Sequence, residues 1–115
     1  MKNNKLLISL LVAGIAALAI PAVASADTGA DIFGSKCVSC HGKDGQGTPG
    51  LAPALKGDPF VVSGKLEDIE ATIQNGRAGD QKKYKDIPVA MPPWHLSDAD
   101  LKAVVAYIRG DLQKQ

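Results

Sequence analysis

The stretch SKCVSCHGKDGQG, residues 35–47, decides the fold, because it places Cys37, Cys40 and His41 within five consecutive positions. These two cysteines are the only ones in the chain. A disulfide between them would close a very short loop and would remove little chain entropy, so a structural bridge explains them poorly. The residues that follow include several glycines and show no helical or alternating apolar pattern, which indicates a loop directly after the motif.

Three kinds of site can use two cysteines and a histidine at this spacing. A thiol–disulfide redox site is expected after a strand, and no alternating pattern precedes Cys37. A zinc site would take Cys37, Cys40, His41 and His95, without the usual second paired motif. Cys-x-x-Cys-His is also the attachment signature of c-type haem. Cysteines three apart on a helix face can bond both vinyl groups of one porphyrin, and His41 then presents its imidazole to the iron.

Residues 1–26 are typical of a secretory signal peptide. Two lysines precede an uncharged and mostly apolar run over residues 6–20, and the small residues at 24–26 suit a signal peptidase. The apolar run is shorter than the roughly 20 residues that span a membrane. An uncleaved N-terminal anchor is the alternative. We expect export to the periplasm and cleavage after Ala26, which leaves residues 27–115 as one domain.

The composition of residues 27–115 restricts both the partners and the core. The 13 Lys and Arg of the chain include Lys2 and Lys5, so this part holds 11 basic against 12 acidic side chains, a formal charge of −1. Such a balance argues against a nucleic-acid partner. A domain of this size buries only about 60% of its unfolded surface, and its five aromatic residues are few. We therefore expect a bound group to fill part of the core.

Apolar periodicity predicts three helices and no strand, hence an all-α fold. The helices are expected over residues 28–40, from near Ser63 to Asn75–Gly76, and from Ser97 to Gly110. Thr28 with Asp31, and Ser97 with Asp100, have the spacing of helix N-caps. In the third helix the apolar positions Leu101, Val104, Val105 and Ile108 form one stripe.

A long loop separates the first two predicted helices. Eight of the residues from 42 to 59 are Gly or Pro, and long irregular segments inside small domains are usually functional. The apolar residues Leu51, Pro53, Leu55 and Phe60 indicate that this loop packs against something. We expect it to wrap one face of a flat ligand, with glycines allowing close backbone approach.

The second axial ligand of a haem iron would come from the segment VAMPPWHL. Met91 is the only methionine in residues 27–115, and Pro92 and Pro93 stiffen the chain directly after it. His95 is the competing ligand, because imidazole also binds haem iron. Met91 is predicted as the ligand, since His95 is expected at the surface beside the last helix.

CVSCHG, LAPALKG and MPPWHLSDADLKAVVAYI, in that order, resemble the monohaem class I cytochromes c of bacterial periplasms. The resemblance covers essentially all of residues 27–115. It implies a small cytochrome c fold around one covalent haem c, with His41 and Met91 on the iron. It also implies one-electron transfer between transient redox partners, periplasmic or membrane-bound, by a monomeric protein that is not an enzyme. A gas sensor or weak peroxidase, and a subunit of a larger redox complex, remain as alternatives.

The same resemblance implies roles for further residues. The carbonyl of Pro53 would accept the ring N–H of His41, and the indole of Trp94 would donate to a haem propionate, with Arg77 as a second propionate partner. The first and last helices would cross at Gly29 or Gly34, with Phe33 meeting Tyr107.

The segment 79–90 departs from the resembled pattern because it is longer than the usual link to the methionine. It carries Lys82, Lys83 and Lys85, which are either a solvated run or a positive rim that steers an acidic partner.

Overall fold

The computed structural model describes residues 14–19 and 27–115. Most of the predicted signal peptide, including the cleavage position after Ala26, lies outside the described residues and stays a prediction. Within the described ranges, no helix is both long and apolar enough to cross a membrane.

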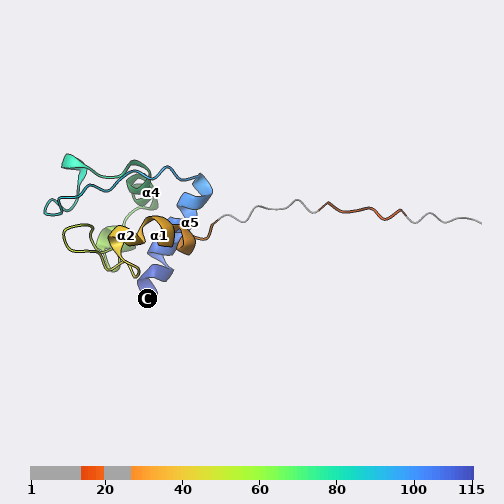
Figure 1. Ribbon diagram of the computed structural model, residues 1–115, viewed down its shortest axis with the longest axis horizontal. Helices are drawn as coiled ribbons and strands as arrows, with labels where there is room; N and C mark the ends of the chain where they lie inside the picture. Colours follow the sequence, from red (N-terminus) through yellow and green to blue (C-terminus); the bar gives the residue numbers. More distant parts are fainter. Residues whose placement is uncertain (1–13, 20–26) are drawn as a thin grey trace, which may run out of the picture.

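Residues 27–115 fold into short helices joined by loops (Figure 1). The α-helices are α1 (Gly29–Lys36), α2 (Val38–His41), α3 (Pro59–Ser63), α4 (Leu66–Asn75) and α5 (Asp98–Arg109), and the 3₁₀ helices are η1 (Gly79–Gln81) and η2 (Asp111–Lys114). The described residues form no strand beyond two isolated bridges, Thr48 with Ala52 and Arg77 with Met91. The predicted all-α fold is therefore confirmed.

The first predicted helix is interrupted at Cys37. The Thr28 capping box forms as predicted, but α1 ends at Lys36 and α2 begins at Val38. Cys37 has φ −113° and ψ −30°, away from the helical φ of about −63°, so the regular hydrogen-bond series stops and restarts there. Gly42, with φ 82°, ends α2 directly after His41.

The second predicted helix starts later than expected, and a separate helix precedes it. Ser63 ends α3 instead of beginning α4, which starts at Leu66. The prediction of an irregular loop up to residue 62 was wrong for α3. Asp58 caps α3 by accepting from Phe60 N at 2.9 Å and Val61 N at 3.3 Å, and Pro59 occupies the first helical position.

The crossing of α1 and α5 forms the centre of the core. Phe33, 1% exposed, packs on Tyr107 with ring centroids 5.5 Å apart and planes at 51°. Gly29, and not Gly34, is the close-packed glycine of this crossing, because Gly34 has no atom near the position of a side chain. The predicted stripe of α5 is buried in the same core.

Candidate cofactor site

One large cavity opens between α2, the loop at residues 51–55, α4 and the segment 82–94. Its empty volume is about 1230 Å³, part of which is open to solvent. All six residues predicted to bind the cofactor line it: Cys37, Cys40, His41, Pro53, Met91 and Trp94. His95 is exposed and lies outside the lining.

The geometry around His41 prepares one ring nitrogen for a ligand. His41 Nδ1 lies 2.9 Å from the carbonyl oxygen of Pro53, so a proton on Nδ1 is donated there and Nε2 keeps its lone pair. The side chain is 8% exposed. Burial lowers the pKa of His41, and the bond to Pro53 opposes this only partly. The imidazole is therefore neutral at pH 7, as iron coordination requires.

The two cysteines form no disulfide with each other and line the same cavity as His41. Burial raises the pKa of the Cys37 thiol to about 11, although Lys36 acts in the opposite direction. A thiol with this pKa is protonated at neutral pH and is a poor nucleophile, which disfavours the thiol–disulfide alternative. No three His, Cys, Asp or Glu side chains in residues 14–19 and 27–115 are grouped to hold a metal ion, so the zinc tetrad with His95 is not assembled.

Met91 is held against the end of α4. It is partly buried and packs on the hydrophobic core. Gly76 follows α4 with φ 66°, and a β-carbon there would lie 2.3 Å from the Met91 carbonyl oxygen. Glycine is therefore required at position 76 both by its backbone conformation and by the close approach of the Met91 segment.

Trp94 and Arg77 both line the cavity, in different surroundings. The ring of Trp94 has the ammonium of Lys36 over it, 5.4 Å from its centroid. The guanidinium of Arg77 stacks on the ring of Phe60 at 4.5 Å. The propionate contacts implied for Trp94 and Arg77 stay predictions.

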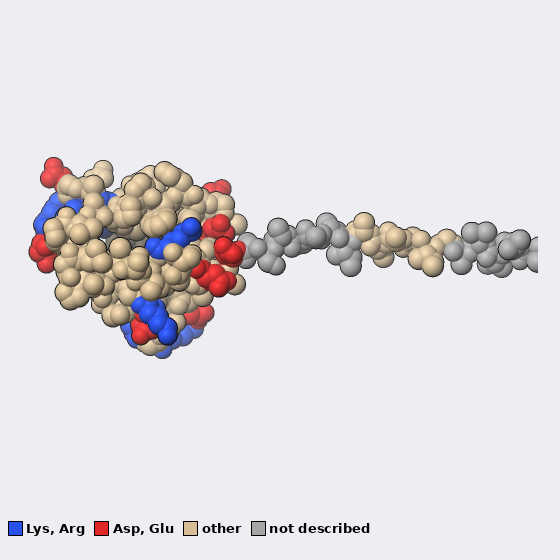
Figure 2. Space-filling model, in the orientation of Figure 1, with Lys and Arg blue, Asp and Glu red and all other residues tan. Residues whose placement is uncertain are grey.

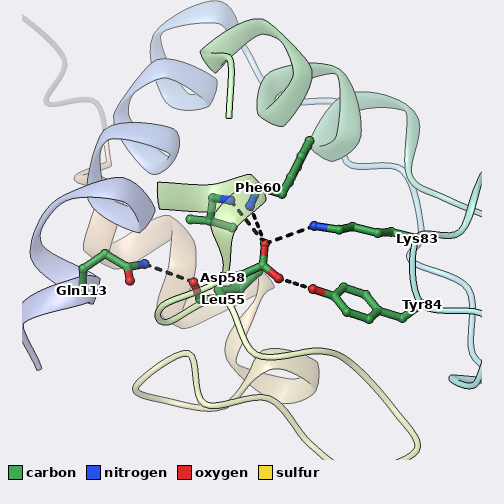
Figure 3. Close-up of polar contacts among 7 residues, drawn as sticks. Leu55, Asp58, Phe60, Lys83, Tyr84 and Gln113 are labelled. Atoms are coloured by element: carbon green, nitrogen blue, oxygen red, sulfur yellow. Dashed lines mark hydrogen bonds and ion pairs between the residues drawn. The ribbon is translucent and has the colours of Figure 1, made fainter. Parts of the chain in front are cut away.

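Asp58 joins the loop side of the cavity to the segment 79–90 (Figure 3). Besides capping α3, its carboxylate accepts from the hydroxyl of Tyr84 and from Lys83 Nζ, the latter at 3.5 Å. Burial raises the pKa of Asp58, but the bond from Tyr84, the Lys83 charge and the two amides outweigh it and lower the pKa. The Asp58 bond in turn raises the pKa of Tyr84 to about 12.

Sequence reasoning missed Asp58 and Tyr84. The Asp58-Pro59 pair was a local signal for the cap of α3. The contact with Tyr84 joins residues 26 positions apart and has no local signal. The segment 79–90 thus forms a cavity wall tied to α3, with Lys82 and Lys83 in the lining.

Comparison with known proteins identifies the family. Residues 24–108 match the family described as cytochrome C oxidase, cbb3-type, subunit III. The chain belongs to this cytochrome c family. The cbb3-type cytochrome c oxidase subunit CcoP of Rhodobacter capsulatus is 35% identical over 86 residues, covering 74% of this chain and 29% of the relative. The chain thus spans less than a third of that relative's length.

Solved structures agree with this assignment. Cytochrome c6C from Synechococcus sp. PCC 7002 is 26% identical, with a TM-score of 0.51 over 77% of this chain and 99% of that one. The KustC0563 c-type cytochrome, 22% identical, has a TM-score of 0.53 over 73% of this chain and 96% of that one, which supports the fold alone. The family is one of electron-transfer proteins with covalently bound haem c, and the two thiols, buried imidazole and thioether around one cavity fit that cofactor.

Proposed function

We propose that this chain is a periplasmic one-electron carrier in which Cys37 and Cys40 hold haem c, and His41 and Met91 are the axial ligands. One observation carries the proposal. The neutral, buried His41 is oriented by Pro53 at 2.9 Å, and it shares a cavity with both cysteines and Met91. This set supplies two thioether positions and two axial donors of the kinds that haem c uses.

The residues of the chain orient and tune the cofactor. When bound, haem iron supplies the change between ferric and ferrous states. The Pro53 carbonyl holds the His41 ring in one orientation and increases its strength as a donor. The thioether of Met91 is a weak donor to ferric iron, so it favours the ferrous state. Apolar residues such as Ile69 and Ile73 line the cavity and disfavour additional positive charge there.

We assign transient redox proteins as donor and acceptor of a monomeric carrier. Basic and acidic side chains lie in separate small groups over the face in Figure 2, which does not present one continuous basic surface. The second candidate is a cytochrome subunit of a larger redox complex. The cbb3-type oxidase subunit name of the Rhodobacter relative supports this candidate.

Absorption spectra of the exported protein in both redox states, with and without carbon monoxide, test the proposal. A carrier with two persistent axial bonds leaves the ferrous spectrum unchanged by carbon monoxide at neutral pH. Rapid carbon monoxide binding by the unmodified protein would contradict the proposal and would favour a gas-binding sensor.

A further inference from the structure

Residues 91–96 form neither helix nor strand, and two of them cannot donate a backbone hydrogen bond. Pro92 and Pro93 lack an N–H, so the segment has to be held on both sides of the prolines. Before them, Arg77 N donates to Met91 O at 2.9 Å and Met91 N donates to Arg77 O at 3.0 Å. The Met91 end is therefore held by backbone groups.

After the prolines, the last turn of α4 holds the segment. Trp94 N donates to Ile73 O at 2.9 Å. The side-chain amide of Gln74 bonds to Leu96 in both directions: Leu96 N donates to Gln74 Oε1 at 3.0 Å, and Gln74 Nε2 donates to Leu96 O at 3.1 Å. The amide of Gln74 thus takes the place of a neighbouring backbone strand.

We propose that Gln74 is a positioning residue that keeps the Met91 thioether on the iron. This inference rests on the proposed axial role of Met91. Gln74 supplies the only side-chain group among the bonds just described, so a substitution there removes support without changing the backbone pairs. Loss of both its bonds leaves the Leu96 backbone with only the bond from Leu96 N to Trp94 O at 3.0 Å. The hold of α4 on residues 91–96 is then weaker, which raises the fraction of molecules in which Met91 has left the iron. A competing ligand then binds more tightly in proportion to that fraction.

Gln113 provides a matched control, because its side-chain amide bonds to Leu55 of the cavity loop (Figure 3). Its Nε2 donates to Leu55 O at 3.2 Å and to Ile108 O at 2.9 Å, and its Oε1 accepts from Gly57 N at 2.7 Å. Gln113 therefore ties η2 to the loop that carries Pro53. Its removal costs at least as many hydrogen bonds as removal of Gln74, but none of them touches residues 91–96.

The test is a titration of the ferric holoprotein with imidazole. The loss of the weak red-edge absorption band of sulfur-to-iron coordination measures how much imidazole has replaced Met91. Gln74→Leu keeps a similar side-chain size without hydrogen bonds. The net loss of about one hydrogen bond from a folded conformation changes its population roughly tenfold. We therefore expect Gln74→Leu to bind imidazole about tenfold more tightly than the unmodified protein. Gln113→Leu should match the unmodified protein in imidazole affinity, although both variants lower the melting temperature.

Gln74→Glu keeps an oxygen acceptor for Leu96 N but turns a second oxygen toward Leu96 O, which repels it. Its imidazole affinity should therefore also exceed that of the unmodified protein. This variant decides the question if Gln74→Leu does not fold. Equal affinities for the Gln74 and Gln113 variants, or no change in either Gln74 variant, would overturn the positioning role. Met91→Ala separates the two proposals. If the red-edge band survives in this variant, Met91 is not the axial ligand. If the band is lost but the Gln74 variants bind imidazole as the unmodified protein does, only the positioning role of Gln74 is wrong.

Discussion

Gly29 lies so close to Ala103 that a β-carbon on the glycine would be 2.1 Å from the Ala103 carbonyl oxygen. The same atom would be 2.7 Å from the β-carbon of Tyr107. Backbone atoms of α5 cannot move aside as the end of a flexible side chain can. The contact of α1 with α5 therefore depends on the absence of a side chain at position 29.

Substitution by alanine at the two glycines of α1 is expected to change the free energy of unfolding in opposite directions. Gly29→Ala forces α1 away from α5 and should lower the free energy of unfolding by about 1–3 kcal/mol. At Gly34 no atom lies within 4 Å of the place that a β-carbon would occupy, so Gly34→Ala should raise it by about 0.5–1 kcal/mol through helix propensity. Urea unfolding at pH 7 measures both. Equal effects of the two substitutions would contradict the close-packed crossing.

Covalent attachment predicts that haem stays with the denatured chain. Acid-acetone should extract no haem from the unmodified protein, because thioethers at Cys37 and Cys40 hold it. Cys37→Ala and Cys40→Ala should each retain haem through one bond, and the double variant should lose it. Extraction of haem from the unmodified protein, or two freely titrating thiols in it, would refute attachment.

The axial assignment predicts different results for two candidate ligands. Met91→Ala should abolish the red-edge band of the ferric protein and lower the reduction potential, because a weak donor to ferric iron is replaced. His95→Ala is the control, since His95 is exposed and outside the cavity lining. Loss of the band in His95→Ala with Met91 intact would reverse the assignment.

The lowered pKa of Asp58 predicts a stability difference that depends on pH. Because the folded state prefers the carboxylate, its stabilisation is complete above the usual Asp pKa of about 3.9 and is lost as pH falls through the lower folded value. Asp58→Asn keeps a helix cap but loses the charge that Lys83 and Tyr84 contact. We expect it to lower the free energy of unfolding by about 1 kcal/mol at pH 7, and by progressively less below about pH 4.

Asp111→Asn is the control for this measurement. Asp111 pairs with Lys114 at 3.1 Å, but both side chains are about three-quarters exposed, and such pairs contribute little. Urea unfolding of the three proteins across the acid range separates the cases. A constant difference between Asp58→Asn and the unmodified protein at every pH would exclude the carboxylate as its cause.

The lysines of the segment 79–90 test how partners approach. Their ammonium groups are bonded within the molecule: Lys82 to Ile87 O, Lys83 to Asp58, and Lys85 to Asp80 O at 2.6 Å. The charges can still steer an acidic donor, so changing all three to Gln should slow second-order reduction at low salt. The difference should close with added salt, because exposed charges are screened over about 10 Å at 0.1 M.

Lys102→Gln with Lys114→Gln is the control, since neither lysine lines the cavity. Stopped-flow reduction at several ionic strengths gives the rates, and the reduction potential should be nearly unchanged. Equal slowing at every ionic strength would show that the three lysines do not steer.

Local patterns predicted the helix ends that short-range hydrogen bonds define. The Thr28 capping box, the Ser97 cap and the end of α5 before Gly110 occur as predicted, because each depends on residues within a few positions. The break at Cys37 and the separate helix α3 were not predicted. The break comes from the backbone angles of a single residue, and the Asp58-Pro59 signal of α3 lies within a stretch rich in glycine and proline.

The sequence by itself determined the family of this protein, because Cys-x-x-Cys-His places two thiols and an imidazole together by local spacing alone. Only the tertiary structure decided which residues hold the methionine segment and close the cavity wall. Gln74 meets Leu96 across 22 positions, and Asp58 meets Tyr84 across 26. Such pairs leave no periodic signal, since they form only after the chain has folded back on itself and brought distant segments together.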